Sequence, residues 1–387
     1  MSLLSGSRGL KALRSTNRRR LLDLLREHGE LSRADLARRT GLSATTVSSL
    51  ITELATQGMV AEGGVDDHSR TGRTGRPARL VRLVGERGLV IALGVTRDEV
   101  TAAVCDLSGA VLTEQTRPVE VDRADSLARI AALVNEAAGA VRGPITRLVL
   151  GVPGVVETST GYISSARVSA WQQLAPGPVL AAATGLDTYV ENDADLCALG
   201  EHSFGAALGM DDIAYVKASS GIGAGLVLGG RLYRGYQGGA GELGHMEVAE
   251  FGDLCLCGNR GCLETQASLE NVLSALRVVR PEVRTAADLA ELVQAGDRAA
   301  IRVVTDAGLA IGRTVAALCN VLAPQAVVVG GELAGGGTHL ADTIRNAVER
   351  YTKPRTAEGI TVLPAQLGTR AALLGAVATA VAAEAAA

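Results

Sequence analysis

Two stretches of this chain repeat one arrangement of strands and glycine loops, and that repetition restricts the fold more than any other feature. Residues 88–119 predict three strands with a turn at 107–109, followed by a helix over 126–142 and a buried strand that runs into a Gly/Pro loop over 145–156. Residues 212–235 again predict a strand, a glycine loop, a second strand and a turn. The pattern indicates two α/β lobes with a cleft between them.

The elements that follow the second block complete a large α/β body. We expect helices around 268–278 and 297–322, a strand at 326–331 and a last helix near 371–384. A chain of 387 residues, 47% of them apolar, can bury a sizeable core, and its length predicts two or three domains. The alanine-rich last stretch is too weakly apolar for a membrane span and no targeting segment is recognisable, so we expect a cytoplasmic protein.

The first eighty residues follow a different pattern, that of three short helices. Leucines between positions 21 and 25 give the first helix an apolar side, and Gly29 ends it. Ser32 and Asp35 make a capping-box-like start for the second helix, which Gly41 ends. Ser43 caps the third helix, whose apolar residues have the spacing i, i+3, i+4, i+7 of one buried stripe: Val47, Leu50, Ile51 and Leu54.

The outer face of the third helix carries small hydroxyl residues, which let a helix settle into a DNA major groove. Residues 63–82 are rich in glycine and arginine and suit a β-wing with a returning strand, so the segment is typical of a winged helix-turn-helix. An ordinary three-helix bundle with a flexible basic linker is the alternative. We predict DNA contacts at Arg33, Ser43, Thr45, Thr46, Ser48, Ser49, Arg73 and Arg76.

The distribution of charge agrees with a nucleic-acid partner. Residues 1–82 contain fifteen Arg and Lys against eight Asp and Glu, which is +7, so the remainder carries −10 because the total is −3. A basic segment on an acidic body is expected where one part meets a polyanion, although a solvated basic surface has the same charge. The first aromatic residue is Tyr162, so the basic segment lacks the stacking platforms of single-strand readers. The predicted partner is a double-stranded DNA operator.

Residues 245–264 concentrate a histidine and three cysteines, which could form a catalytic metal site, a redox switch or a structural clip. His245, Cys255, Cys257 and Cys262 would supply the four ligands of a structural zinc site and leave no open position for catalysis. Their spacing differs from that of common zinc fingers. In the cytoplasm thiols stay reduced, which favours a metal over disulfides. The other cysteines lie in apolar strands or helices and are predicted to be inert: Cys105, Cys197 and Cys319.

Six motifs follow one another along the body: GVPGVV (151–156), VENDADLCALGE (190–201), SSGIGAG (219–225), GAGELGHMEV (239–248), CLCGNRGCLE (255–264) and VVVGGEL (327–333). In this order they resemble the ROK family, which groups bacterial sugar kinases with sugar-responsive repressors, over nearly the whole sequence. The resemblance implies a two-lobed actin-like ATPase (sugar kinase) fold with sugar bound between the lobes. It implies structural Zn²⁺ on the four Cys/His residues and sugar contacts from Asn192, Asp193, Glu242, His245 and Glu264.

Two departures from the kinases of this family bear on activity. Those kinases begin with a strand ending in D-x-G-G-T, whereas residues 92–96 read A-L-G-V-T. Ala92 removes a carboxylate that organises Mg²⁺ and water, and Val95 places a branched side chain where backbone approaches phosphate. The sugar-contacting Asn of the kinases has Arg167 or Val168 near its place, and an Arg there could hold a phosphate or a carboxylate. Asp193 is then expected to anchor a ligand and not to act as a base.

These observations predict a winged helix-turn-helix domain over 1–82 and a ROK sugar-kinase-like sensing domain over 83–387, with a zinc knuckle at 245–262. The predicted function is a sugar-responsive repressor of genes for carbohydrate uptake or catabolism, without enzymatic activity. It would act as a homodimer or a homotetramer and bind no membrane. An active sugar kinase that also regulates transcription is the alternative, and a regulator set only by a partner protein is the third reading.

Overall fold

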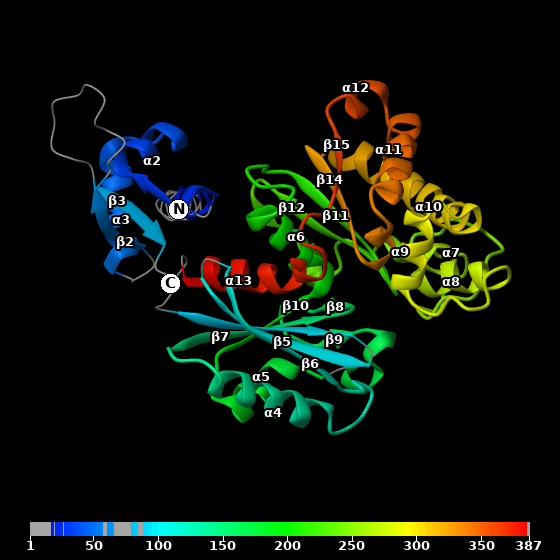
Figure 1. Cartoon of the computed structure of the whole chain (residues 1–387), viewed down its shortest axis with the longest axis horizontal. Coiled ribbons are helices and arrows are strands. Elements are labelled where there is room, and N and C mark those ends of the chain that lie inside the picture. Colours follow the sequence, from blue (N-terminus) through cyan, green and yellow to red (C-terminus); the bar gives the residue numbers. More distant parts are fainter. Residues whose placement is uncertain are drawn as a thin grey trace, which may run out of the picture.

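A small N-terminal unit and a larger body of two lobes make up the fold (Figure 1). The computed structural model describes residues 17–18, 20–25, 27–56, 60–65, 79–83, 88–96, 98–107, 109–172 and 174–384. The predicted combination of a helical N-terminal unit with a two-lobed α/β body is confirmed.

The N-terminal unit is a winged helix. A helix around residues 20–25 packs with α2 (Arg33–Thr40), α3 (Ala44–Thr56) and a three-stranded sheet ordered β1 (Glu30–Ser32), β3 (Arg79–Leu83), β2 (Val60–Val65). The Asp35 backbone N–H donates to Ser32 Oγ at 3.1 Å, and Gly41 ends α2 with a φ of 70°, so both predicted caps are confirmed. The antiparallel pairing of β2 with β3 distinguishes this unit from a plain three-helix bundle.

The predicted domain boundary at residue 82 falls inside the last wing strand. β3 ends at Leu83, and the first strand of the body, β4, begins at Leu89. The tip that joins β2 to β3 contains the predicted DNA contacts Arg73 and Arg76, and it lies outside the described residues.

The first lobe is a five-stranded sheet in the order β10-β7-β4-β5-β6. The three strands predicted in the first block form an antiparallel meander: β4 (Leu89–Val95), β5 (Glu99–Asp106) and β6 (Val111–Pro118). Strands β7 (Ile145–Val152) and β10 (Thr188–Asn192) then extend the sheet in parallel. Both α4 (Ser126–Gly139) and α5 (Pro176–Thr184) pack on one face of this sheet, which the apolar run of β4 requires because it is buried on both sides.

The second lobe repeats the same plan. Its sheet has the order β13-β12-β11-β14-β15, again three antiparallel strands followed by two parallel ones. The strands are β11 (Ile213–Ala218), β12 (Ile222–Leu228), β13 (Arg231–Leu232), β14 (Ala326–Gly330) and β15 (Thr361–Pro364). Its helices are α7 (Glu264–Ala267), α8 (Leu269–Arg277), α9 (Ala286–Gln294), α10 (Arg298–Leu322), α11 (His339–Tyr351) and α12 (Pro354–Ala357). The repeated pattern in the sequence therefore corresponds to a repeated strand order.

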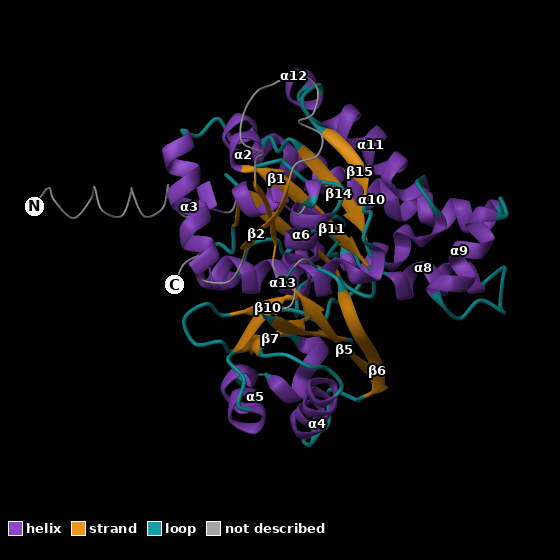
Figure 2. Ribbon diagram, turned by 60° about the vertical axis from the view of Figure 1, so that its left-hand side comes forward, coloured by secondary structure: helices purple, strands orange, loops and turns teal. Residues whose placement is uncertain are grey.

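Two helices, α6 (Asp193–Phe204) and α13 (Ala371–Glu384), pack against each other between the two sheets (Figure 1, Figure 2). Helix α6 follows the last strand of the first lobe and packs on β11 and β12, whereas α13 returns to β4 and β7. Glycines allow the close contact, because a Cβ at Gly200 would lie 2.1 Å from the carbonyl oxygen of Ala371, and a Cβ at Gly375 would lie 1.8 Å from that of Leu196. The packed pair of helices therefore connects the two lobes.

None of the helices in the described part of the chain combines the length and the apolar character that crossing a membrane would require.

Candidate ligand cleft, metal centre and DNA-binding surface

The outward face of α3 has the composition predicted for a DNA-reading helix. Its inward stripe is fully packed, with Val47, Leu50, Ile51 and Leu54 all at most 2% exposed. On the other side Thr45 and Ser49 are exposed, and Thr46 and Ser48 are half-buried. Ser43 caps the helix: its hydroxyl accepts a hydrogen bond from the Thr46 backbone N–H at 3.1 Å. The predicted contact residues of α3 thus lie together at one helix surface.

Arg33 is engaged inside the winged helix. Its guanidinium pairs with Glu62 of β2 and donates to the Ser48 carbonyl oxygen at 3.3 Å. These contacts join the start of α2 to the wing and to α3, so Arg33 helps to position the reading helix. Its role as a DNA contact stays a prediction.

Asn192 holds the start of α6. Its side-chain oxygen accepts hydrogen bonds from the backbone N–H groups of Ala194, at 2.8 Å, and Asp195, at 3.0 Å. Its amide donates to the Gly154 carbonyl oxygen at 2.9 Å, which leaves one amide hydrogen for a ligand. Asn192 therefore places the first residue of α6, Asp193, and ties it to the loop that follows β7.

Asp193 forms an ion pair with Lys217, which lies on β11 of the second lobe. Burial by itself disfavours the ammonium, but the Asp193 carboxylate outweighs this effect and raises the pKa of Lys217 above its usual value. Lys217 therefore stays charged and holds one oxygen of Asp193. Lys217 was not among the predicted site residues, although a lone charged residue within the apolar strand IAYVKA is a usable signal.

Glu264 and Glu242 approach this pair from the second lobe. Glu264 is 8% exposed, and its carboxylate accepts a hydrogen bond from the Ile222 backbone N–H at 3.0 Å. Burial raises the pKa of Glu242; nearby His245 opposes this change, while Glu264 and Asp193 add to it. The structure therefore brings Asp193, Glu242, His245 and Glu264 into one neighbourhood, with acceptor oxygens suited to sugar hydroxyls, and their contact with a sugar stays a prediction.

A second ion pair, between Glu191 and Arg234, links the two lobes near Asp195. Glu191 lies on β10 and is 3% exposed. Its Oε2 lies 2.6 Å from Nη2 of Arg234, and this ion pair links the first lobe to the segment after β13. Asp195 lies close by at 4% exposure, and burial, together with the Glu191 charge, raises its pKa from 3.8 to about 8. Asp195 is thus mostly protonated at neutral pH and can donate a hydrogen bond.

The Asp195→Asn variant is expected to be more stable than the wild type at alkaline pH. Because the pKa of Asp195 is higher in the folded chain than in the unfolded one, its contribution to stability is complete below about pH 4 and is lost as the pH rises to about 8. Asparagine does not titrate, so the gain at pH 9 should be on the order of a few kcal/mol. The measurement is the melting temperature from pH 5 to 9, with Asp187→Asn as an exposed control. Parallel profiles for variant and wild type would contradict the assignment.

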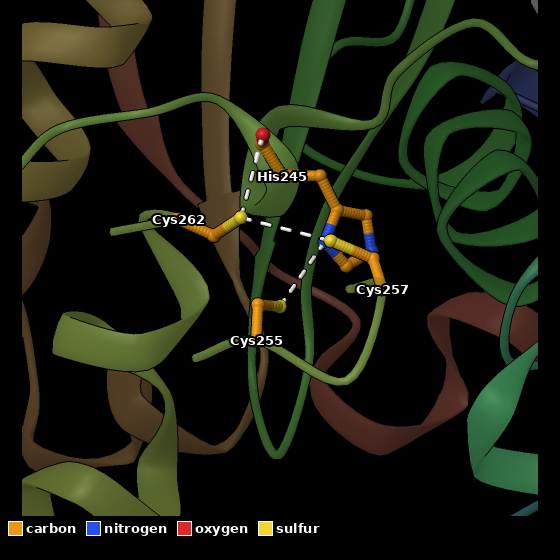
Figure 3. A group of neighbouring side chains, drawn as sticks. All are labelled: His245, Cys255, Cys257 and Cys262. Carbon is orange, nitrogen blue, oxygen red and sulfur yellow. Dashed lines mark hydrogen bonds between the residues drawn. The ribbon is translucent and has the colours of Figure 1, made fainter. Parts of the chain in front are cut away.

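His245, Cys255, Cys257 and Cys262 converge into one cluster, with all four ligand atoms within 4.8 Å of one another (Figure 3). Cys255 Sγ lies 3.6 Å from His245 Nδ1, and Cys257 Sγ lies 3.7 Å from Cys262 Sγ. A tetrahedral zinc site with bonds of about 2.0–2.3 Å has edges of about 3.5–3.8 Å, so these separations and this donor set fit the ion. The predicted group is therefore assembled, and it could hold a metal.

Tight turns bring the cysteines together. Gly258 and Gly261 have φ angles of 92° and 63°, and a Cβ at Gly261 would lie 1.6 Å from the Ala249 carbonyl oxygen. Both glycines permit this turn. The second is required twice, by its left-handed conformation and by the contact.

His245 connects the cluster to the candidate sugar residues. Its Nδ1 faces Cys255, while its Nε2 lies 3.6 Å from Glu242 Oε2. A metal on Nδ1 would leave the proton on Nε2, directed at Glu242. One imidazole therefore joins the Cys/His cluster to Glu242, a candidate sugar residue.

The three remaining cysteines are buried as predicted. Burial raises the pKa of the thiols of Cys105 and Cys197 to about 12 and that of Cys319 to about 11. Such thiols carry almost no thiolate at neutral pH, so they are unreactive core residues.

Ala92 and Val95, which are predicted to stand in the place of the kinases' phosphate loop, lie in apolar packing. Ala92 is completely buried on β4 and Val95 is 5% exposed. Val168, one of the two residues predicted to lie near the place of the sugar-contacting Asn of the kinases, is completely buried, so it offers no surface to a ligand. The side chain of Arg167 lies outside the described part of the chain.

The glycine-containing motifs at residues 219–225 and 327–333 contact each other. The Glu332 backbone N–H donates to Ser219 Oγ at 3.2 Å, and a Cβ at Gly331 would lie 2.4 Å from the Ala218 carbonyl oxygen. Gly331 is therefore needed for packing, whether or not a nucleotide binds.

Comparison with known proteins gives a match for both parts of the chain. The ROK family profile matches residues 90–383, and a winged helix-turn-helix DNA-binding profile matches residues 14–61. The xylose repressor of Bacillus subtilis (strain 168) is 28% identical over 371 residues, which cover 94% of each chain.

Solved structures of similar fold include a regulator and a kinase of this family. A ROK family transcriptional regulator, a homologue of the Escherichia coli Mlc protein, has a TM-score of 0.78 at 26% identity and covers 97% of both chains. A ROK family glucokinase from Streptomyces griseus, in complex with glucose and AMPPNP, has a TM-score of 0.68 at 27% identity and covers 75% of this chain and 98% of its own. The regulator thus matches nearly the whole chain, and the glucokinase matches three quarters of it.

Proposed function

Because the chain belongs to the ROK family and carries a winged helix in front of that domain, we propose that it is a sugar-responsive, DNA-binding transcriptional regulator. Its expected role is repression of genes for carbohydrate uptake or catabolism. The kinase-like body binds a sugar or sugar derivative and does not transfer phosphate. The winged-helix domain and the sensing domain would correspond to residues 1–82 and 83–387 only approximately, since β3 extends to Leu83.

The ion pair between Asp193 and Lys217 is the observation that carries this proposal. In a kinase of this fold, the Asp at this position must take the proton from the attacking hydroxyl. Here an ammonium already holds one oxygen of that carboxylate. Lys217 also lies next to the glycine loop that would face a nucleotide, residues 219–225. Asp193 is therefore suited to bind a hydroxyl and poorly suited to deprotonate it.

The apolar packing of β4 supports the same conclusion. Phosphoryl transfer depends on positioning and on charge stabilisation of the phosphate and its Mg²⁺. Ala92 offers no ligand for Mg²⁺, and Val95 offers no free backbone approach. The sugar would be held by Asn192, Asp193, Glu242, His245 and Glu264.

We assign a structural Zn²⁺ to the cluster of His245, Cys255, Cys257 and Cys262. When bound, the ion would cross-link the segment between Glu242 and Glu264 and stabilise it against rearrangement. The four cluster residues would then hold Glu242 and Glu264 in a fixed position relative to each other. His245 would pass changes at Glu242 to the clip, which links ligand binding to the rigidity of this part of the cleft.

Binding of the operator would use the outward face of α3 and the wing. The regulator would act as a homodimer or homotetramer, because paired half-sites match a two-fold axis. A continuous apolar cluster includes residues of both the winged helix and α13, such as Leu25 and Val381. Cleft closure could thus move the winged helix, provided that the sugar binds the two arrangements unequally.

An active kinase that also regulates is the second candidate, favoured by the glucokinase match over 75% of this chain. A coupled assay for ADP over a panel of sugars is expected to show no turnover above background. Turnover at about 1 s⁻¹ or faster, as is typical of kinases, would establish the second candidate.

The double variant Arg73→Ala, Arg76→Ala is expected to weaken operator binding. Loss of two phosphate contacts should reduce the slope of log K against log salt by about two. The matched control is Arg142→Ala, Arg298→Ala, which removes the same charge from exposed positions of the body. Equal affinities and slopes for both double variants would show that the wing does not contact DNA.

A further inference from the structure

We propose that the cleft has a second sugar subsite beside β8 (Val155–Val156) and β9 (Ile163–Ser164), so that the effector is a disaccharide or a longer glycan. The inference rests on the proposed function, because it concerns the ligand of the same cleft. A hollow of about 470 Å³ lies at this hairpin, lined by Glu157, Tyr162, Ile163 and Ser164. Its volume is in the range of small-molecule sites, about 300–1,000 Å³.

The hairpin lies next to the residues assigned to the first sugar. Asn192 donates to the Gly154 carbonyl oxygen, one residue before β8. From the other lobe, Gly238 contacts β8 so closely that a Cβ there would lie 2.1 Å from the Val156 carbonyl oxygen. Four residues after Gly238 comes Glu242. Both arms of the first sugar site therefore touch the strand that borders the hollow.

The lining has the chemistry of a pyranose site. Tyr162 is 46% exposed, which leaves part of its ring free to stack against the C–H face of a sugar. The Glu157 carboxylate accepts hydrogen bonds from the Thr160 hydroxyl at 2.6 Å and from the Ser159 hydroxyl at 3.1 Å. A carboxylate has about four acceptor positions, so Glu157 can still bind ligand hydroxyls, and the Ser164 hydroxyl adds a further donor.

The hairpin is rigid before a ligand arrives. The Glu157 backbone N–H donates to the Tyr162 carbonyl oxygen at 2.9 Å, and the Gly161 N–H donates to the Glu157 carbonyl oxygen at 2.8 Å. The Tyr162 N–H in turn donates to the Thr160 hydroxyl at 3.1 Å. A preformed turn holds the ring and the carboxylate in place, which reduces the entropy lost on binding.

The charge of the lining selects against phosphorylated ligands. Among the lining residues that the structure describes, Glu157 is the charged one, and it would repel a phosphate or carboxylate at this position. The subsite therefore fits a neutral ring carrying hydroxyl groups.

Calorimetry on the full-length protein tests the subsite with matched probes: xylose against xylobiose, and glucose against cellobiose and maltose. At least one disaccharide is expected to bind about tenfold or more tightly than its monosaccharide. Tyr162→Ser should remove this advantage and leave the monosaccharide affinity unchanged, while Tyr162→Phe keeps the ring and the advantage. Tyr351→Ser, a change at a similarly exposed tyrosine of α11, should alter neither affinity.

The outcomes separate the subsite from the proposed function. A monosaccharide that binds as tightly as every disaccharide, or a Tyr162→Ser variant that keeps the ratio, overturns the subsite and leaves the sugar-sensing function in place. If neither class of sugar binds the wild-type protein, the proposed function fails and the subsite fails with it.

Discussion

Replacing Cys257 with serine is expected to release the bound metal and to abolish the response of operator binding to sugar. Serine is a poor ligand for zinc, and three remaining donors hold the ion far less tightly. Cys257 is the exposed member of the cluster, whereas Cys255 and Cys262 are buried, so this substitution changes the metal site with little effect on packing. Metal content by mass spectrometry and sugar-dependent operator release are the measurements.

The control for this variant is Cys319→Ala, which removes a buried thiol of α10 far from the cluster in sequence. It should keep one metal per chain and the full response. A Cys257→Ser protein that lacks metal and still responds to sugar would contradict the role of the clip. Retention of the metal would instead contradict the ligand assignment.

Gly375→Ala is expected to destabilise the body by at least about 3 kcal/mol, near the upper end for overpacking substitutions. In a helix, alanine is ordinarily more stabilising than glycine by about 1 kcal/mol. The expected change in stability has the opposite sign here because the new Cβ meets the backbone of α6. The new Cβ would lie 1.8 Å from the Leu196 carbonyl oxygen, and a backbone atom of α6 cannot yield as a side chain would. Chemical denaturation followed by circular dichroism measures the loss.

The matched substitution is Gly139→Ala, at the end of α4, where a Cβ meets nothing within 4 Å. It should leave stability unchanged or raise it slightly. If both variants have the same midpoint of unfolding, the close packing of α6 on α13 does not hold in solution. Because α6 begins with Asp193, a tolerated but loosened Gly375→Ala protein should also bind sugar more weakly.

Local patterns in the sequence were sufficient for most of the secondary structure. The caps at Ser32 and Ser43 and the helix over 297–322 follow from residue types within a few positions of one another. The metal cluster was predictable for the same reason, because its ligands lie within eighteen residues and its glycines permit the turns between them. Helices α5, α6, α9 and α11 were not predicted, although α6 and α9 begin at the caps Asn192 and Thr285 and α5 ends at Gly185.

The partners of the charged residues could not be read from the sequence. Nothing local to Lys217 points to Asp193, and nothing local to Arg234 points to Glu191. Arg33 has the positive charge of a phosphate contact, yet its guanidinium forms an ion pair with Glu62 within the same domain. The meeting of Gly200 and Gly375 with backbone of the opposite helix likewise depends on how α13 returns to the first lobe.

The sequence by itself determined that this protein has a winged helix, a doubled α/β body and a Cys/His cluster, because hydrophobic period, caps and ligand spacing act over short distances along the chain. Only the tertiary structure decided which carboxylates stay free and which are neutralised. Strand order places β10 and β11 in different sheets, and α6 brings Asp193 from the first to face Lys217 on the second. That pairing is set by the packing of the two lobes, and it is the feature that favours a sugar sensor over a kinase.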